Sequence, residues 1–309
     1  MQFSSLRIFL SILESGSFSQ AAKLEHLSQP ALSSIVANLE KEVGYKLLDR
    51  TPGQRKRVEP TPAGKRLADF ARKTLLEYDR TLLQIAERAK DLSSLTVSVT
   101  ASPSATVFPI LCDYFREQYP LVELYAMQTQ SSHTVFQQLF QGPAALCISG
   151  SAPHDPRLAS LPFFYDPPVL ICSTNANLRQ TISLRDLSSL PLIHRPEQAS
   201  NLSATILRFL EKRGIRKSDL NIILEVPGDA DVLHAVSLTK NAVGFVSRSL
   251  FELSGAQSSV RQINVRGFSV ERYLHISYVK ETPLSLEARL FMDCAKRGEW
   301  ARGYFTSIG

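Results

Sequence analysis

The chain opens with three segments in which apolar residues recur at helical spacing. The first spans residues 5–15 and the second residues 18–24. In the third, residues 29–40, the stripe follows an i, i+3, i+4, i+7 pattern and consists of Leu32, Ile35, Val36 and Leu39. Ser17 and Ser28 precede the second and third segments, where a serine side chain can cap a helix. We therefore expect a compact three-helix unit at the start of the chain.

The face of the third helix opposite its apolar stripe is short, polar and almost free of carboxylates. A helix of this kind fits the major groove of DNA, where amide and hydroxyl side chains can meet base edges. Helical spacing alone is equally compatible with an ordinary helical hairpin in a hydrophobic core. The residues expected to contact DNA from this helix are Gln29, Pro30, Ser33, Ser34 and Asn38.

Residues 44–62 change character, because basic side chains crowd together and Pro52–Gly53 marks a turn. This pattern indicates the β-hairpin wing of a winged helix-turn-helix, whose tip can hold phosphates or enter the minor groove. In most proteins a charge run is only a solvated face. Beside a DNA-reading helix, the predicted wing contacts are Arg50, Arg55, Lys56 and Arg57.

A long amphipathic helix follows the predicted wing. Thr61 is placed to be its N-cap and Pro62 its first residue. Apolar residues then recur as far as Ala89, so that about thirty residues form a rod of roughly 45 Å. A domain of about sixty residues cannot cover such a rod. The stripe therefore predicts a partner helix, most simply from a second copy of the chain.

After residue 93 the hydrophobic period changes from helical to alternating, and strands then alternate with helices. This alternation predicts an open, mostly parallel α/β sheet, repeated in a second set from 169 to 265. The strands expected in the first set are 95–100, 122–127 and 145–149, and the helices are 107–118 and 133–141.

Length and composition describe an ordinary globular protein. The 309 residues suffice for two or three domains, with 44% hydrophobic and 21% charged residues. No run of eighteen apolar residues occurs, and the first nineteen residues do not form a convincing secretory signal, so we expect a cytoplasmic protein without a membrane partner. The net charge of +6 is modest and does not by itself indicate a polyanionic partner.

The cysteines and histidines do not indicate a metal or redox centre. Cys112, Cys147, Cys172 and Cys294 are widely separated and form no CxxC pair, so we interpret them as buried, inert thiols. The six histidines lack the spacing of metal ligands. We therefore expect no cofactor and no metal site.

Several N-terminal segments together resemble the LysR-type transcriptional regulators. GSFSQAA at 16–22, SQPALS at 28–33, Gly44, LLDR at 47–50 and TPAG at 61–64 occur in the family's order over about sixty residues. A run of matched segments is far more specific than one short motif. The resemblance implies a winged helix-turn-helix at residues 1–60, a linker and dimerisation helix at 61–92, and an effector-binding domain at 93–309.

The second half resembles the effector-binding domain of the same family more loosely. The matching segments are FREQYPLVEL at 115–124, Gly142 and KNAVGFVSRS at 240–249. The chain departs from the family pattern where Ala145 replaces an aspartate and Ala242 replaces a glycine, although neighbouring Asn241 can still adopt a left-handed conformation.

The predicted fold class is therefore α/β, with an all-α-rich N-terminal winged helix-turn-helix, a long linker helix and a bilobed effector domain like the periplasmic binding proteins. The resemblance places one subdomain at residues 93–164 and 268–309 and the other at 165–267. It implies a sequence-specific transcriptional regulator, in which a homodimer or homotetramer binds a partly palindromic double-stranded promoter site. A small-molecule effector, with an organic anion as one candidate, modulates DNA binding. RNA polymerase is a further candidate partner.

Polar residues at strand ends and helix starts are the candidates for effector contact, because ligands of bilobed α/β domains favour the carboxyl ends of strands. The alternative is that each hydroxyl or amide only caps its own helix. By resemblance, Ser102 and Ser132 match positions that often touch the effector, and Arg195 either adds charge or lies on the surface. The full candidate set is Ser102, Ser104, Thr129, Ser131, Ser132, Ser149, Arg195, Ser200, Asn201 and Phe245.

Two other classes of protein remain as alternatives. An enzyme that modifies small molecules, with an appended helical domain, is disfavoured because Ser149–Gly150–Ser151 lacks the GxSxG pattern, and GxGxxG and GKS/T loops are absent. We assign no catalytic residue. A solute-binding protein would share the bilobed layout, but it requires a secretory signal and does not explain the DNA-reading helix.

Overall fold

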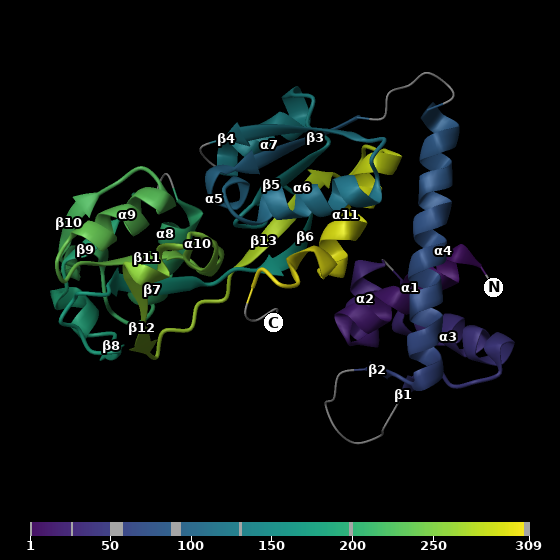
Figure 1. Cartoon of the computed structure of the whole chain (residues 1–309), viewed down its shortest axis with the longest axis horizontal. Helices are drawn as coiled ribbons and strands as arrows, with labels where there is room; N and C mark the ends of the chain where they lie inside the picture. Colours follow the sequence, from purple (N-terminus) through teal and green to yellow (C-terminus); the bar gives the residue numbers. More distant parts are fainter. Residues whose placement is uncertain are drawn as a thin grey trace. The chain divides into compact units, whose positions relative to one another are not determined.

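The computed structural model of the chain describes residues 2–25, 27–49, 58–87, 94–129, 132–197 and 200–305. The chain divides into two compact units, Met1–Leu92 and Ser93–Gly309 (Figure 1). Each unit has its own hydrophobic core and is described by itself.

The N-terminal unit is a helical bundle with a short antiparallel ribbon. Its elements are α1 (Phe3–Ser15), α2 (Phe18–Leu24), α3 (Gln29–Val43), β1 (Leu48–Asp49), β2 (Glu59–Pro60) and α4 (Pro62–Glu87). Apolar residues from all four helices and from β1 form one core, including Phe9, Ile12, Leu32, Val36, Leu48 and Leu75. Burial of these stripes holds the short helices together, since helices of this length are only marginally stable alone.

The predicted helix caps of this unit are confirmed. Ser17 and Ser28 adopt extended backbone conformations, and their side chains accept hydrogen bonds from the backbone N–H groups of Gln20 and Ala31. The Thr61 hydroxyl accepts a hydrogen bond from the backbone N–H of Gly64 at 3.0 Å. These caps satisfy N–H groups that have no partner within the helix, so they place the starts of α2, α3 and α4.

The long helix α4 carries its apolar stripe beyond the core. Leu67, Ala71 and Leu75 are buried in the core, whereas Phe70 and Ile85 are 48% and 62% exposed. The described helix ends at Glu87, so the predicted continuation to Ala89 lies outside the described residues. The exposed apolar side chains agree with the expectation that this helix requires a partner.

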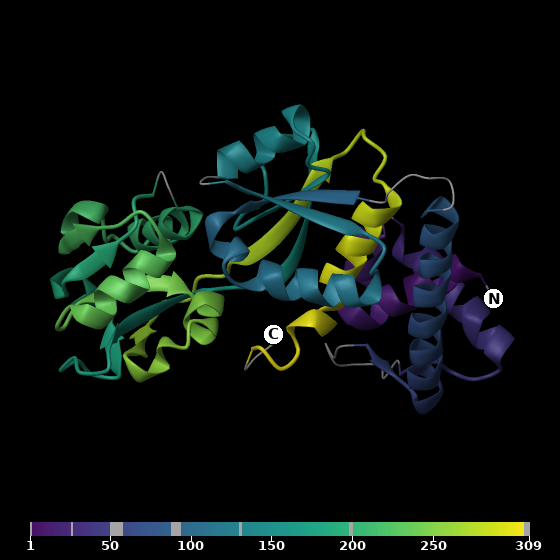
Figure 2. The same cartoon turned by 45° about the horizontal axis from the view of Figure 1, so that its top comes forward.

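The first lobe of the C-terminal unit is a sheet with strand order β4-β3-β5-β13-β6. The helices α6 (Val107–Gln118) and α11 (Leu286–Arg297) pack together on one face, and α7 (Ser132–Gln141) covers the other (Figure 2). The strands are β3 (Ser94–Thr100), β4 (Glu123–Thr129), β5 (Leu146–Ser149), β6 (Leu158–Tyr165) and β13 (Tyr273–Val279).

The second lobe is a sheet with strand order β10-β9-β11-β7-β12-β8. Alternate residues of one strand face opposite cores: Leu170 and Cys172 pack under α8, whereas Val169 and Ile171 pack under α9. The elements are β7 (Pro168–Ser173), β8 (Thr181–Ser183), β9 (Leu192–His194), α8 (Asn201–Glu211), β10 (Ile222–Glu225), α9 (Asp229–Leu238), β11 (Val243–Ser247), α10 (Arg248–Leu253) and β12 (Val260–Arg266).

The two lobe sheets are mixed rather than mostly parallel. β3, β4 and β5 are parallel, but β13 pairs antiparallel with β5 and β6, and β7 pairs antiparallel with β11 and β12. The reason is the chain path: it enters the second lobe through β7, leaves through β12 and returns as β13. The strands on either side of the crossings therefore pair antiparallel, β6 with β13 in the first lobe and β7 with β12 in the second.

In the second lobe, Asn241 adopts a left-handed conformation, with φ of 59°, as expected for the residue before Ala242.

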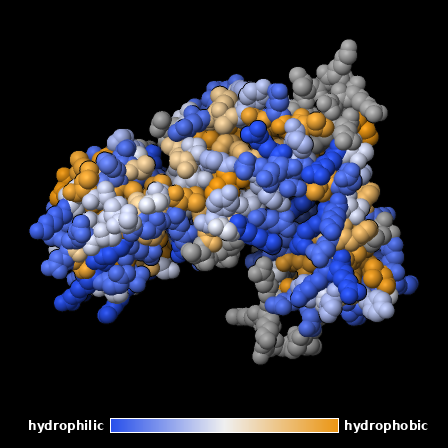
Figure 3. Space-filling view, viewed as in Figure 1, coloured by the Kyte–Doolittle hydropathy of each residue, from blue (hydrophilic) through white to orange (hydrophobic). Residues whose placement is uncertain are grey.

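The end of this lobe where Figure 1 draws β10 carries a hydrophobic cluster in Figure 3. Exposed apolar residues there are Ile223 and Leu224 on the edge strand β10 and Leu238 at the end of α9.

Candidate DNA-binding face and effector cleft

The exposed face of α3 presents the residues predicted to read DNA. Gln29, Pro30, Ser34 and Asn38 are exposed and Ser33 is half-buried, whereas Leu32, Val36 and Leu39 on the opposite side are buried. The Gln29 side-chain oxygen accepts a hydrogen bond from the hydroxyl of Ser19 on α2 at 3.1 Å. This bond orients Gln29 at the exposed N-terminal end of α3. The face thus offers short hydroxyl and amide groups of the kind that match base edges.

A buried carboxylate fixes the base of the wing to this helix. Glu40 of α3 accepts hydrogen bonds from the backbone N–H groups of Leu47 at 3.0 Å and Leu48 at 3.5 Å, and its other oxygen pairs with Lys46 Nζ at 2.7 Å. Burial alone would raise the pKa of Glu40, but the bonds from Lys46, Leu47 and Leu48 outweigh burial and lower it. Glu40 therefore stays charged and ties the start of the wing to α3.

The start of α4 closes onto the same wing base. The Thr61 hydroxyl donates a hydrogen bond to the Lys46 carbonyl at 2.6 Å. A Cβ atom on Gly64 would collide with the backbone carbonyl of Leu47, so only glycine fits there. The helix-start pattern of the sequence predicted Thr61 as an N-cap, and the TPAG segment included Gly64, but sequence reasoning missed Glu40. The predicted contacts Arg50, Arg55, Lys56 and Arg57 lie outside the described residues.

The candidate effector residues of the first lobe gather where its parallel strands end. Thr129 ends β4 and Ser149 ends β5, and both are buried. Ser132 begins α7, and Ser131 lies outside the described residues. The carboxyl ends of β3, β4 and β5 form one edge because these strands are parallel. We call Ser102, Ser104, Thr129, Ser132 and Ser149, at and just after these strand ends, the strand edge of the first lobe.

The serines at this edge differ in their bonding. Ser104 donates a hydrogen bond to the Ala101 carbonyl at 2.9 Å, and Ser149 donates one to the Ser151 carbonyl at 2.8 Å. The Ser102 hydroxyl is buried and has no hydrogen-bond partner among the described residues. Buried polar groups are nearly always paired, so Ser102 supplies a hydroxyl with unused bonding capacity among the described residues of this edge.

In the second lobe, most candidate effector residues have structural partners. Ser200 is buried and caps α8, accepting a hydrogen bond from the backbone N–H of Ser203 at 3.2 Å. Arg195 is 7% exposed and pairs with Asp229 Oδ1 at 3.3 Å, so the alternative that Arg195 lies on the surface is wrong. Phe245 is buried and stacks on Phe268 with ring centroids 5.0 Å apart.

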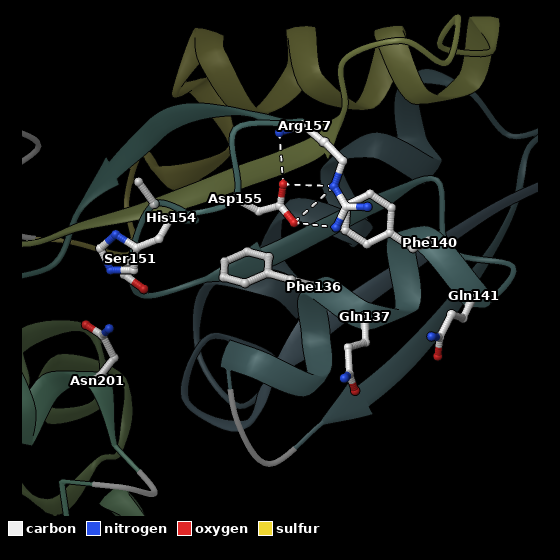
Figure 4. A pocket seen from close by; sticks show the side chains of 10 residues that line it. Phe136, Gln137, Phe140, Gln141, Ser151, His154, Asp155, Arg157 and Asn201 are labelled. Carbon is white, nitrogen blue, oxygen red and sulfur yellow. Dashed lines mark hydrogen bonds and ion pairs between the residues drawn. The ribbon is translucent and has the colours of Figure 1, made fainter.

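Asn201 at the start of α8 faces the first lobe across a cleft of about 570 Å³ (Figure 4). The first-lobe residues that line it come from the outer side of α7 and from the loop after β5. Of the predicted effector residues, only Asn201 is among those that line this cleft within the described chain. The lining residues missed in the sequence are Phe136, Gln137, Phe140, Gln141, Ser151, Ala152, His154, Asp155 and Arg157.

The charges in this cleft are paired with one another. Arg157 binds both carboxylate oxygens of Asp155, with Nε–Oδ1 at 3.0 Å and Nη2–Oδ2 at 2.6 Å, and its guanidinium lies 4.2 Å from the centre of the Phe140 ring. Hydrogen bonding from Arg157 lowers the pKa of Asp155 to about 2. The cleft therefore offers amide, imidazole and aromatic groups rather than a net charge.

The thiols fit the interpretation of buried, inert cysteines. Cys147, Cys172 and Cys294 are buried and Cys112 is half-buried. Burial raises the pKa of Cys112 and of Cys147 to about 12. Within the described residues, His, Cys, Asp and Glu side chains form no group of three or more that could hold a metal ion. No described helix is long and apolar enough to cross a membrane.

Comparison with known proteins extends these observations to the whole chain. Residues 3–65 match the family described as bacterial regulatory helix-turn-helix protein, lysR family, and residues 89–299 match the LysR substrate binding domain. The transcriptional activator CmpR of Synechocystis is 26% identical over 93% of this chain and 92% of its own length. A probable RuBisCO transcriptional regulator of Synechocystis is 30% identical over 88% of this chain and 79% of its own length.

Solved structures show the same fold at lower sequence identity. Full-length CbnR, crystallised with its target DNA, aligns with a TM-score of 0.57 and 21% identity over 96% of this chain and 99% of its own. The regulatory domain of Synechocystis CcmR, solved with 2-PG, aligns with a TM-score of 0.59 and 18% identity over 66% of this chain and 96% of its own. Both family matches and these folds agree with the helix-turn-helix, the long α4 and the bilobed C-terminal unit. The chain therefore belongs to the LysR family of transcriptional regulators.

Proposed function

We propose that this chain regulates transcription by binding a partly palindromic DNA site as a homodimer or homotetramer, and that a small molecule in the C-terminal unit modulates this binding. The assigned parts are a DNA-binding domain at 1–60, a linker and dimerisation helix at 61–92 and an effector domain at 93–309. The subdomains of the effector domain are 93–164 with 268–309, and 165–267. RNA polymerase is a further partner in this proposal, and the cytoplasm is the place of action.

The observation that carries the proposal is the exposed polar face of α3 within a chain of this family. Gln29, Ser33 and Ser34 lie at the start of a helix whose other side is fully packed, so the face is rigid and accessible. The relative CbnR was crystallised with its target DNA. By analogy, Gln29, Pro30, Ser33, Ser34 and Asn38 contact bases, and Arg50, Arg55, Lys56 and Arg57 contact phosphates or the minor groove.

The effector proposal has two parts. The strand edge of the first lobe, with Ser102, and the start of α8, with Asn201, supply hydrogen-bonding groups on the two lobes. Helix N-termini at Ser132 and Asn201 favour a small organic anion, in line with the 2-PG found in the CcmR domain. Because Arg195 and Arg157 are already paired with carboxylates, we assign anion binding to backbone N–H and hydroxyl groups rather than to these cations.

The experiment that tests this function is selection of bound sites from random and genomic DNA by the full-length protein, repeated over a range of salt concentrations. Recovery of a partly palindromic motif with a steep salt dependence is the expected result. Failure to enrich any sequence with folded protein would overturn the proposal and would return attention to the C-terminal unit as a solute-binding domain.

The assignment of individual contacts requires variants tested on the selected site and on random DNA. Gln29→Ala and Ser33→Ala are expected to weaken binding to the selected site more than to random DNA, with a loss of about 1–3 kcal/mol for each lost base contact. Neutralising Arg55, Lys56 and Arg57 together is expected to weaken both and to flatten the salt dependence. Equal losses on both DNAs for Gln29→Ala would remove it from the base-reading set.

The proposal assigns no catalytic reaction to the chain. The relatives named above are transcriptional regulators, and the hydroxyl of Ser149 is hydrogen-bonded to the Ser151 carbonyl rather than to a general base. Absence of turnover of small molecules that bind the C-terminal unit would agree with this assignment, and measurable turnover would contradict it.

A further inference from the structure

The two segments that connect the lobes are bonded directly to each other. Residues 166–167 lead from β6 into β7, and residues 267–272 lead from β12 back into β13. The backbone N–H of Asp166 donates to the Arg272 carbonyl at 2.9 Å. Arg272 Nη1 in turn binds the Asp166 carbonyl at 2.9 Å and its carboxylate oxygen Oδ2 at 2.8 Å. Both residues are buried, with exposed fractions of 1% for Asp166 and 6% for Arg272.

A serine of the second lobe completes this cluster. The backbone N–H of Ser249, in the first turn of α10, donates to Asp166 Oδ1 at 2.9 Å. The Ser249 hydroxyl donates to the hydroxyl of Thr106 in the first lobe at 3.4 Å. The Asp166 carboxylate thus contacts a crossing segment through one oxygen and the second lobe through the other. We call Asp166, Arg272, Ser249 and Thr106 the hinge cluster.

The hinge cluster also reaches the strand edge of the first lobe at two points. The Thr106 hydroxyl donates to the Ser102 carbonyl at 3.0 Å, next to the buried Ser102 hydroxyl that has no partner among the described residues. The Arg272 guanidinium lies against Gly150, where a Cβ atom would collide with Nη2. Gly150 directly follows Ser149 at the end of β5. A shift of the loops that carry Ser102 or Ser149 therefore displaces members of the hinge cluster.

Its chemistry gives the cluster one defined geometry. A buried carboxylate and guanidinium must keep their hydrogen bonds, because leaving either charge unpaired in the interior is strongly unfavourable. Arg272 bonds the carbonyl and the carboxylate of Asp166 through one nitrogen, Nη1, while Nη2 of the same rigid, planar guanidinium lies against Gly150. Packed interfaces of this kind shift between discrete arrangements rather than deforming smoothly. The angle between the lobes is therefore coupled to the bonds of this cluster.

We propose that the hinge cluster sets the angle between the two lobes and transmits occupancy of the strand edge to that angle, with Arg272, Ser249 and Thr106 as positioning residues. The inference rests on the proposed function, since it concerns regulation through the same effector domain. In this proposal, the strand edge is coupled to the angle between the lobes through two contacts, Ser102 with Thr106 and Gly150 with Arg272.

The test is a distance measurement between the lobes in the full-length protein. Spin labels are placed at Asp113 on α6 and Glu211 on α8, both exposed, through a noncanonical amino acid because Cys112 is half-exposed. Labelled chains are mixed with excess unlabelled chains so that distances within one subunit dominate. The compared variants are Ser249→Ala and Thr106→Val, which remove the hydroxyl link between the lobes. The third is Arg272→Lys, which keeps the charge but loses the planar guanidinium that lies against Gly150.

We expect the wild-type protein and the control Ser254→Ala to share one narrow distance distribution. The Ser254 hydroxyl bonds backbone groups of its own segment, the Phe251 carbonyl and the Ala256 N–H, and among the described residues it has no bond to the other lobe. Ser249→Ala and Thr106→Val are expected to shift and broaden the distribution while the protein remains folded by circular dichroism. Distributions identical to wild type in all three hinge variants would overturn the proposal. The result does not depend on DNA, so a failure of DNA site selection would refute the proposed function without affecting this measurement.

Discussion

At the scale of single residues, the buried carboxylate of Glu40 is expected to stabilise the base of the wing. Glu40→Gln leaves one acceptor for the N–H groups of Leu47 and Leu48 but loses the charge that binds Lys46. The substitution should lower the stability of the wing base by about 1–2 kcal/mol. Hydrogen exchange in peptides covering residues 46–49 should therefore accelerate at pH 7. Glu59→Gln, on the exposed strand β2, is the matched control and should leave these amides unchanged.

The pH dependence of this effect has a defined sign. Because the pKa of Glu40 is lowered in the folded protein, its stabilising contribution is complete above the ordinary carboxyl pKa of 4.5. That contribution is lost as the pH falls through the lowered value. The difference in exchange between wild type and Glu40→Gln should therefore narrow below pH 4.5. A difference that stays constant into acid would show that the charge of Glu40 is not what holds the wing base.

The thiols provide a second prediction at this scale. With a pKa of about 12, Cys112 carries a thiolate fraction of about 10⁻⁴ at pH 8, far below that of an unperturbed cysteine. Iodoacetamide should therefore label Cys112 slowly and the buried Cys147 more slowly still, as measured by peptide mass spectrometry. Urea-unfolded protein, in which all thiols are exposed, is the reference. Rapid labelling of Cys112 in the folded protein would instead identify a reactive, redox-competent thiol.

At the scale of elements, the packing of α9 on its sheet depends on Gly244 of β11. A Cβ atom there would lie 2.5 Å from Val232 Cγ1 and 2.9 Å from Val236 Cγ2. Gly244→Ala should therefore destabilise the C-terminal unit by about 1–3 kcal/mol, measured by thermal unfolding. Val232→Ala makes room for the added methyl group, so the double variant should lose less stability than the sum of the two single variants. Additive losses would contradict this account of the contact.

The elements also show which features a sequence can predict. Helix starts at Ser17, Ser28 and Thr61 were predictable because a cap and its N–H donor lie within three residues of each other. The pair of Asp166 and Arg272 was not, because 106 residues separate its members and no local pattern links them.

The lining of the cleft was missed for a related reason. Phe136 and Phe140 have the spacing of a core stripe, but Val135 and Leu139 on the same helix are the buried residues. The core residues and the cleft residues of α7 thus differ by one position in the helix. Packing of α7 against β5 decides which of the two sets faces the core. Sequence reasoning therefore located the strand edge, because the direction of parallel strands decides which residues lie there. It missed the cleft wall, because the rotation of α7 about its axis decides which of its residues face the cleft.

At the scale of the whole molecule, the exposed part of the α4 stripe is expected to hold a dimer together. Ile85 is 62% exposed on this stripe, beyond the core of the N-terminal unit. In a symmetric interface each substitution acts twice, so replacing Ile85 by glutamate removes about 3–6 kcal/mol of apolar burial. Ile85→Glu should therefore raise the dimer dissociation constant by about two to four orders of magnitude, measured by sedimentation velocity.

The same substitution should also have different effects on binding to a half-site and binding to the full DNA site. Two linked α3 helices bind a partly palindromic site with an advantage that single helices lack, so Ile85→Glu should lose most affinity for the full site and little for an isolated half-site. Ile85→Leu keeps the apolar surface and should behave as wild type in both assays. If Ile85→Glu stayed dimeric and kept full-site affinity, pairing would have to be assigned to a surface other than this part of α4, and the exposed edge at β10 would be the next to test.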